Sequence, residues 1–157
     1  MLIQLQNFGK YLQPTTFEFA DGLLTVIKGR SGAGKTTIFK AVYWALYDDV
    51  PGYRNNRSTG TVIVTVTINT SRGLLVVQRC KPHKFVCTLN GVEYHDRAGE
   101  SLVYQIFGMP EVFQAACYRV QQSQNVLMST SSANKLALIR WLTFGEHESE
   151  VEPHITK

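Results

Sequence analysis

The chain has 157 residues, of which 44% are hydrophobic and 18% are charged. That length suits one domain, and the composition excludes wholesale disorder, which requires low hydrophobicity and a high net charge. There is no run of about 18 apolar residues and no basic, apolar leader at the start, so neither a membrane span nor a secretory signal is expected. Three cysteines without a C-x-x-C spacing argue against a disulfide framework and favour an intracellular, reducing compartment.

The charge is unevenly distributed. Residues 1–140 carry 15 Lys/Arg against 8 Asp/Glu, a balance of +7, whereas residues 141–157 carry one lysine against four glutamates, a balance of −3. A basic body suits an anionic ligand such as a nucleotide or a nucleic acid. A basic surface that only keeps the protein in solution explains the same charge equally well.

The first third of the chain predicts three short strands and a helix. Residues 2–8 and 15–19 alternate in polarity, and turn signals separate these strands from the segments that follow them. Residues 23–27, Leu-Leu-Thr-Val-Ile, form a continuous apolar run typical of a strand buried on both faces. After a glycine-rich segment, residues 35–47 have helical periodicity, with a shared apolar face made of Ile38, Ala41, Val42, Ala45 and Leu46.

The remainder predicts a strand meander and then helices. Residues 61–68 alternate almost strictly, residues 73–79 and 85–89 continue the sheet, and Asn90-Gly91 is a strong hairpin signal. From residue 98 onward the pattern is helical, with helices expected at 101–107, 111–118 and 134–144. In the last of these, Leu136, Ile139 and either Leu142 or Trp141 are expected to face inward. The predicted fold class is therefore α/β, with an antiparallel β-meander packed beside the strand and the helix that flank the glycine-rich segment.

One motif carries the chemistry: the segment Gly29-Arg-Ser-Gly-Ala-Gly-Lys35-Thr36 matches the P-loop pattern G-x-x-x-x-G-K-[ST] at every fixed position. Glycines permit the backbone to turn its N–H groups toward one point, and the following helix N-terminus favours a phosphate. Lys35 would reach the β and γ phosphates, and the Thr36 hydroxyl would bind Mg²⁺. The predicted nucleotide-binding residues are Gly29, Arg30, Ser31, Gly32, Ala33, Gly34, Lys35, Thr36 and Thr37. A glycine-rich turn without a ligand would have no need of Lys-Thr.

Other candidate ligands are less specific. Gln121, Gln122 and Gln124 follow an apolar run, and one of their amide oxygens could hold Mg²⁺ or the attacking water; the alternative is an ordinary polar loop. Asp48 and Asp49 form either a metal pair or the end of a helix in a solvated loop. The strands after the P-loop end without the carboxylate that holds Mg²⁺ for hydrolysis, so the sequence predicts no Walker B strand.

The order of these elements resembles the N-terminal half of an ABC-type ATPase head, in detail that of the SbcC-type double-strand-break-repair ATPases and their SMC relatives. The resemblance lies in residues 2–11, 17–29, 41–47 and 136–145, and in Tyr118-Arg-Val-Gln121, which is similar to the family's Q-loop. One departure is Gly9, at a place where many relatives have a basic residue; Lys10 follows it. We expect residues 1–145 to form the N-terminal lobe of the P-loop ATPase head and residues 146–157 to be an acidic tail where a coiled coil would begin.

This resemblance implies a mechanism that needs residues from two halves of an ATPase head, of which this chain would supply the first. It implies ATP and Mg²⁺ as cofactors, Lys35 and Gln121 as catalytic residues, and Thr36 and Gln121 as metal ligands. Family members carry their signature motif and Walker B in a second half, so hydrolysis is expected only when a C-terminal half, on the same or another polypeptide, completes the head. The implied partners are that half, a second head on ATP, DNA and an SbcD-type nuclease; no membrane partner is implied.

Two other functions compete with this one. The first is a small P-loop nucleoside or nucleotide kinase, with Asp96-Arg97 as a substrate-binding pair; such kinases need βα repeats and a parallel sheet, whereas these strands are linked by hairpins. The second is a nucleotide-regulated, DNA-associated binding module that keeps the P-loop mainly as scaffold. The motif reads phosphates and does not distinguish ATP from GTP.

Overall fold

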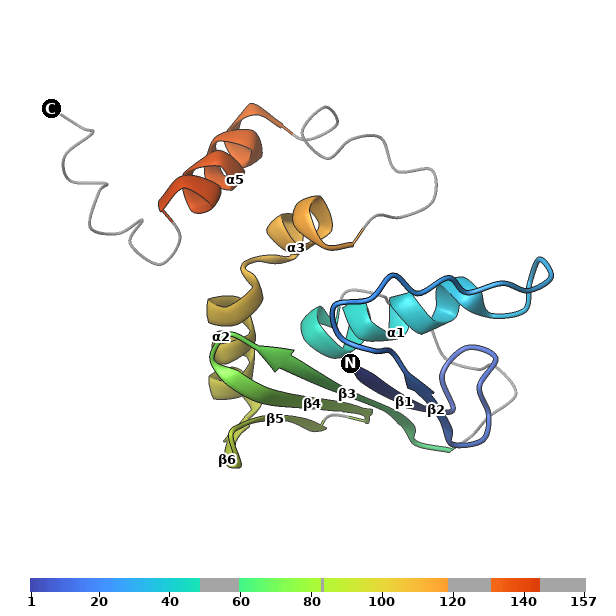
Figure 1. Cartoon of the computed structure of the whole chain (residues 1–157). Coiled ribbons are helices and arrows are strands. Elements are labelled where there is room, and N and C mark those ends of the chain that lie inside the picture. The colour runs from blue at the N-terminus through green and yellow to red at the C-terminus, as the bar shows by residue number, and fades with distance from the viewer. Residues whose placement is uncertain (49–59, 83, 119–130, 145–157) are drawn as a thin grey trace, which may run out of the picture. The chain divides into compact units, whose positions relative to one another are not determined.

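The computed structural model describes residues 1–48, 60–82, 84–118 and 131–144. The chain divides into two compact units, Met1–Val103 and Tyr104–Lys157, and each is described by itself. The first is a sheet with helices on one face and the second is helical, which confirms the predicted α/β class (Figure 1).

The first unit contains one six-stranded antiparallel sheet, in the order β2-β1-β3-β4-β5-β6. From β3 onward each strand pairs with the next along the chain, so the predicted antiparallel meander is confirmed; the Asn90-Gly91 turn joins its last two strands. The strands are β1 (Leu2–Gln6), β2 (Thr15–Glu18), β3 (Val62–Thr70), β4 (Gly73–Lys81), β5 (Lys84–Leu89) and β6 (Val92–His95).

The core lies between this sheet and α1 (Lys35–Tyr47), which packs against β1, β3 and β4 (Figure 1). Alternation along each strand places its apolar side chains toward the helix. The predicted apolar face of α1 is buried, and Tyr43, Trp44 and Tyr47 are buried as well. The buried side chains of the sheet are Ile3, Leu5, Val62, Val64, Val66, Leu75, Val77, Arg79, Phe85 and Cys87.

The helix α2 (Asp96–Phe107) begins earlier than predicted, and its first turns pack on β5. A Cβ atom at Gly99 would lie 2.8 Å from Cε1 of Phe85 and 2.9 Å from the carbonyl oxygen of Tyr94. Only glycine therefore allows this close approach of helix and strand. The early start lacks an apolar period, but Asp96 in the first turn suits the positive end of the helix dipole.

In the second unit, α3 (Pro110–Ala116) contacts α5 (Ser132–Phe144). Leu136 and Ile139 are 51% and 53% exposed, so the prediction that they face inward is wrong. The side chains of Trp141 and Leu142 lie outside what the structure describes. The seven-residue α3, with Val112 and Phe113 buried, is too short to cover an apolar face of a thirteen-residue helix. Within the described ranges, no helix has the length and apolarity that crossing a bilayer requires.

The predicted buried strand at residues 23–27 is also wrong. The segment has no strand structure, and Leu23, Leu24 and Val26 are 71%, 94% and 66% exposed. An apolar run indicates that burial of the segment would stabilise the fold. Such a run becomes a buried strand only where other strands pair with it on both sides. The six strands of the sheet pair with one another, and residues 23–27 are not among them.

Candidate functional site

The glycine-rich segment forms the turn that leads directly into α1. Gly32 and Gly34 have φ values of 75° and 101°, and Gly34 is the N-cap of the helix. Both values lie in the left-handed region, which glycine enters at no steric cost. The turn therefore places residues 29–34 at the N-terminus of a helix that is itself fixed in the core.

The carbonyl oxygens of this turn are occupied by side chains. The Lys35 ammonium donates to the carbonyl oxygens of Gly29, at 2.7 Å, and Arg30, at 2.9 Å. The ammonium of Lys10 donates to the Gly32 carbonyl, and the Tyr11 hydroxyl donates to the Gly34 carbonyl at 3.3 Å. Four acceptors of the turn are thereby held by donors from outside its backbone.

The N–H groups of the turn are mostly unoccupied. Ala33 donates its N–H to the Arg30 carbonyl, at 3.2 Å. Within the described residues, the N–H groups of Ser31, Gly32 and Gly34 take part in no backbone hydrogen bond. Successive free N–H groups beside a helix N-terminus form a site that suits an anion. The residues present therefore fit a phosphate group.

The predicted ligands differ in accessibility. Thr36 is exposed, as are Arg30, Ser31 and Ala33, whereas Lys35 is half-buried. Thr37 is 5% exposed and its N–H donates to the Gly34 carbonyl at 3.0 Å. Gln121, Gln122 and Gln124 lie outside the described residues, as does the 146–157 tail.

A metal ion would find few protein ligands here. Among the described residues, no group of three His, Cys, Asp or Glu side chains is placed to hold a cation. Mg²⁺ keeps several waters and commonly binds through one or two protein oxygens together with substrate phosphates. The exposed Thr36 hydroxyl fits that kind of site.

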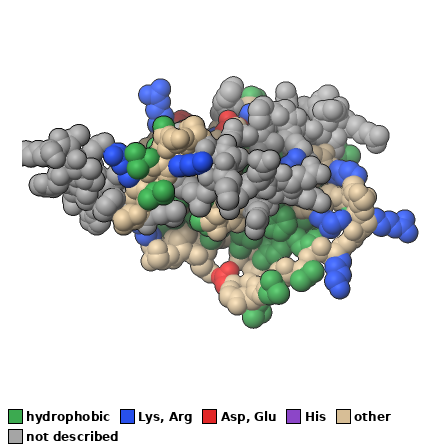
Figure 2. Space-filling model, turned by 90° about the horizontal axis from the view of Figure 1, so that it is seen from above, with side chains coloured by type: hydrophobic (Ala, Val, Ile, Leu, Met, Phe, Trp, Pro, Cys, Tyr) green, Lys and Arg blue, Asp and Glu red, His purple; other side chains and the backbone are tan. Residues whose placement is uncertain are grey.

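The sequence around the turn is rich in positive charge. Residues 10–40 contain Lys10, Lys28, Arg30, Lys35 and Lys40, against Glu18 and Asp21. Figure 2 shows Lys and Arg side chains gathered at the end of the sheet unit that carries the turn. This field attracts an anionic ligand and raises its rate of encounter.

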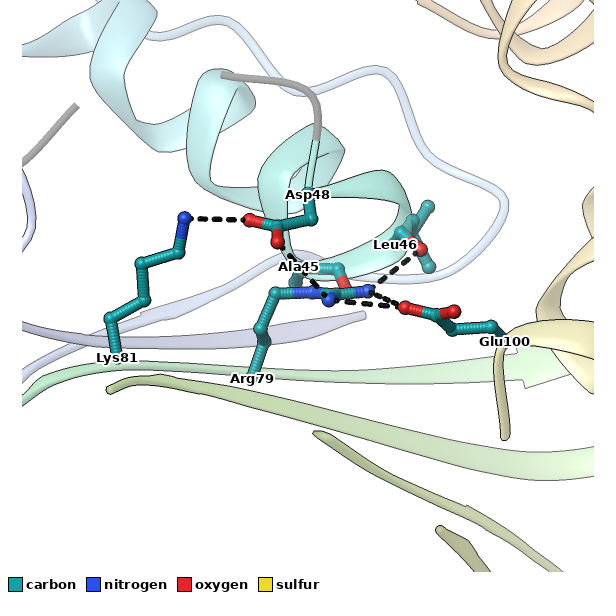
Figure 3. A network of polar contacts seen from close by, with 6 residues as sticks. All are labelled: Ala45, Leu46, Asp48, Arg79, Lys81 and Glu100. Carbon is teal, nitrogen blue, oxygen red and sulfur yellow. Dashed lines mark hydrogen bonds and ion pairs between the residues drawn. The ribbon is translucent and has the colours of Figure 1, made fainter. Parts of the chain in front are cut away.

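A buried arginine holds the opposite end of α1 (Figure 3). Arg79 of β4 is 6% exposed and donates from Nε to the Ala45 carbonyl at 3.0 Å and from Nη2 to the Leu46 carbonyl at 3.4 Å. Its guanidinium also lies 3.4 Å from a carboxylate oxygen of Glu100. Arg79 thus satisfies two of the carbonyls that a helix leaves unpaired at its C-terminus.

Asp48 belongs to the same network. Its carboxylate lies 3.1 Å from the Lys81 ammonium and 3.7 Å from the Arg79 guanidinium, and the residue caps α1 in the left-handed conformation. Of the two interpretations of Asp48 and Asp49, the structure favours the end of a helix for Asp48, and Asp49 lies outside the described residues.

The kinase alternative loses its substrate site. Asp96 and Arg97 line a depression together with Asp48, at the C-terminal end of α1. The glycine turn lies at the N-terminal end of this 13-residue helix, and 13 residues at 1.5 Å each span about 20 Å. A substrate bound at Asp96 and Arg97 would be far beyond reach of a phosphate at the turn. The antiparallel sheet also lacks the parallel βα repeats of such kinases.

The sequence did not predict the roles of two residues: Tyr11, which bonds to the glycine turn, and Arg79, which bonds to the C-terminal end of α1. Tyr11 is 23 residues from its acceptor Gly34, and no local sequence pattern predicts a contact over that separation. Arg79 did leave a signal, because it continues the inward-facing alternation of Leu75 and Val77. A charged residue at a core position of a strand indicates a buried polar partner.

Replacing Gly34 by alanine should lower the free energy of unfolding by about 1–3 kcal/mol, because a non-glycine residue is strained at this φ. The added Cβ would also lie 3.0 Å from the Tyr11 hydroxyl oxygen. Gly22→Ala is the matched control, since Gly22 has a φ of 70° and open space around it. Urea unfolding of the two variants separates backbone strain from the Tyr11 contact; equal losses would show that the contact costs nothing.

Two known proteins are similar in sequence to part of this chain. Part of the chain is 36% identical over 61 residues to the "Probable DNA double-strand break repair Rad50 ATPase" of Aquifex aeolicus (strain VF5), a match that covers 39% of this chain and 6% of that protein. It is also 30% identical over 112 residues to the "Uncharacterized protein 094L" of Invertebrate iridescent virus 3, covering 69% of this chain and 13% of that protein. The chain therefore spans a small fraction of either relative.

A family model extends the likeness over nearly the whole chain. The model described as "AAA domain" matches residues 2–150. Together with the Rad50 relative, this match confirms the predicted resemblance to the N-terminal region of an SbcC/SMC-like ATPase. The chain belongs to the AAA domain family.

Proposed function

We propose that the chain is the Mg·ATP-binding N-terminal half of an SbcC/SMC-like DNA-repair or chromosome-maintenance ATPase. The observation that carries this proposal is the turn at residues 29–34. Side chains hold four of its carbonyl oxygens, while the N–H groups of Ser31, Gly32 and Gly34 stay available at the N-terminus of α1. The family match and the Rad50 relative support ATP as the nucleotide. Residues 29–37 would bind it, with Gln121 as the expected Q-loop residue.

Each proposed role follows from the chemistry of its side chain. Lys35 would leave the Gly29 and Arg30 carbonyls and pair with the β and γ phosphates, which offer a stronger, charged acceptor. The Thr36 hydroxyl would hold Mg²⁺, which when bound neutralises charge on the phosphate oxygens. The N–H groups of the turn would orient the phosphates and exclude water from one side.

We also propose that hydrolysis requires a C-terminal half. Strands β3 and β4 end in Asn69-Thr70 and Cys80-Lys81, so neither supplies a carboxylate for Mg²⁺. The exposed Leu23, Leu24 and Val26 directly precede the glycine turn, where a second half could bury them. Full burial of each side chain would contribute about 1.5–3 kcal/mol. A second head, DNA and an SbcD-type nuclease are the further partners that the proposal includes.

Mg·ATP at ten times its dissociation constant should stabilise the isolated chain by about 1.4 kcal/mol, since the ligand binds only the folded state. For a chain of this size, that corresponds to a rise in melting temperature of roughly 3–6 °C. Differential scanning fluorimetry with Mg·ATP measures the shift, and Mg²⁺ alone serves as the control. A turnover of about 1–1,000 per second by the isolated chain would contradict the need for a C-terminal half.

Changing Leu24 to aspartate should alter the stability of the isolated chain by less than about 0.5 kcal/mol, because the side chain contacts solvent. It should weaken binding to a polypeptide carrying the C-terminal half by roughly tenfold or more, since a charge would be buried at the contact. Val92→Asp on β6, at a side chain 56% exposed, is the matched control. Equal effects of the two substitutions in a pull-down titration would argue against residues 23–27 as the contact.

A further inference from the structure

A tight turn between β1 and β2 lies against the glycine turn. Phe8 and Tyr11 exchange backbone hydrogen bonds of 3.1 and 3.0 Å across it. The Phe8 side chain is fully buried, and its ring centroid lies 5.4 Å from that of Trp44 in α1. The turn between β1 and β2 is therefore anchored to α1, the helix that follows the glycine turn. Lys10 and Tyr11 and the carbonyls that accept their hydrogen bonds are thus attached to the same helix.

The Tyr11 side chain covers Gly34. Its ring meets Phe17 edge to face, with centroids 5.3 Å apart, and its hydroxyl donates to the Gly34 carbonyl. A Cβ atom at Gly34 would lie 3.3 Å from Cζ of the Tyr11 ring. A tyrosine hydroxyl is protonated at neutral pH, and burial raises the pKa of Tyr11 further, so this hydroxyl acts as a donor.

Holding a carbonyl also orients the next N–H. In a trans peptide, the C=O of one residue and the N–H of the next lie in one plane and point in opposite directions. The Tyr11 bond to the Gly34 carbonyl thus helps to fix the direction of the Lys35 N–H. The Lys10 bond to the Gly32 carbonyl restricts the peptide before Ala33, whose N–H closes the turn by donating to the Arg30 carbonyl. Backbone hydrogen bonds from Thr37 and Ala33 hold the turn from within, and the two side-chain bonds further restrict its two glycines.

We propose that Tyr11 and Lys10 are positioning residues, which hold the glycine turn in its phosphate-binding conformation before the nucleotide arrives. The inference rests on the proposed function, because it assigns these side chains a role in nucleotide binding. Neither has to touch the nucleotide for this role. They would raise the fraction of molecules whose turn is already competent to bind. The apparent affinity for the nucleotide is proportional to that fraction.

The first test needs no nucleotide. Backbone ¹⁵N relaxation of the full chain gives order parameters for Gly32 and Gly34, which we expect near 0.85, the value of rigid backbone. In Tyr11→Phe, which keeps the ring and loses the donor, the value for Gly34 should fall toward the flexible range below about 0.6. Leu12→Ala, at an exposed neighbour in the same connection, is the matched control. Unchanged values in Tyr11→Phe would overturn the proposal.

The second test uses Mg·ATP. Tyr11→Phe should weaken binding roughly threefold to tenfold, the effect of one lost hydrogen bond, and Lys10→Met should act in the same direction. The loss should appear in the association rate, with the dissociation rate little changed, because fewer molecules of the free chain have a turn that is competent to bind. The free chain should melt at a slightly lower temperature, because its folded state loses one hydrogen bond. Stopped-flow titration and a melting curve measure these quantities. A loss confined to the dissociation rate would overturn the proposal.

The two tests distinguish a failure of the positioning role from a failure of the proposed function. If the wild-type chain bound no Mg·ATP, the proposed function would fall and the positioning role with it, even where relaxation showed Tyr11 ordering the turn. If the wild-type chain bound Mg·ATP and Tyr11→Phe loosened the turn without changing affinity, the positioning role alone would fall. A loosened turn together with a slower association supports both.

Discussion

Replacing Lys35 by alanine is expected to weaken Mg·ATP binding by roughly 100-fold. A hydrogen bond to a charged group contributes about 1.5–3 kcal/mol, and the upper end of that range corresponds to a loss of about two orders of magnitude. The Lys35 ammonium now bonds to two carbonyls of the glycine turn in a solvent-exposed position. Isothermal titration calorimetry with Mg·ATP measures the loss of affinity.

The same substitution should lower the free energy of unfolding by less than about 1 kcal/mol, because exposed hydrogen bonds are replaced by water at little cost. Lys28→Ala removes an equal charge from an exposed neighbouring position and is the matched control. Its affinity loss should stay within a few-fold. Equal losses in the two variants would show that Lys35 acts only through the general positive field.

Replacing Arg79 by methionine is expected to destabilise the protein by about 3 kcal/mol, since removing one partner of a buried polar network leaves the others unsatisfied. The Ala45 and Leu46 carbonyls would lose their donor at the buried end of α1. Methionine roughly preserves the packing volume over Phe85, whose ring centroid lies 4.2 Å from the guanidinium carbon. The melting temperature should fall by roughly 6–12 °C.

Glu100→Gln serves as the control for the charge pair within that network. The Glu100 side chain is 41% exposed, so water replaces much of what it loses, and the cost should stay below about 1 kcal/mol. Chemical denaturation of both variants separates helix capping from ion pairing. If Arg79→Met cost no more than Glu100→Gln, the two helix carbonyls would not be the groups that matter.

The elements that sequence predicted well are those specified by local signals. The helix at residues 35–47 matches α1 at both ends, because the glycine turn fixes its start and its apolar face persists to Tyr47. The strands of the meander follow from alternation, and the Asn90-Gly91 turn, with positive φ at both residues, has the chemistry that its hairpin demands.

The failures share a cause, which is that burial depends on a partner. Residues 23–27 and the pair Leu136 and Ile139 are apolar enough to be buried, yet the described structure leaves them exposed. The candidate site shows the same limit: the motif identified residues 29–37, whereas Tyr11 acts from another part of the chain through a tertiary contact. Hydrophobicity measures a preference, and topology decides whether it is met.

The exposure of Leu23, Leu24 and Val26 has a practical consequence for anyone who produces this chain. The segment Leu-Leu-Thr-Val-Ile carries no charge and no proline, which is the composition of sequences that self-associate as cross-β strands. Expressed alone, the chain should therefore show light scattering that rises steeply with concentration. Co-expression with a polypeptide that covers this segment, or the Leu24→Asp substitution, should raise the yield of dispersed protein.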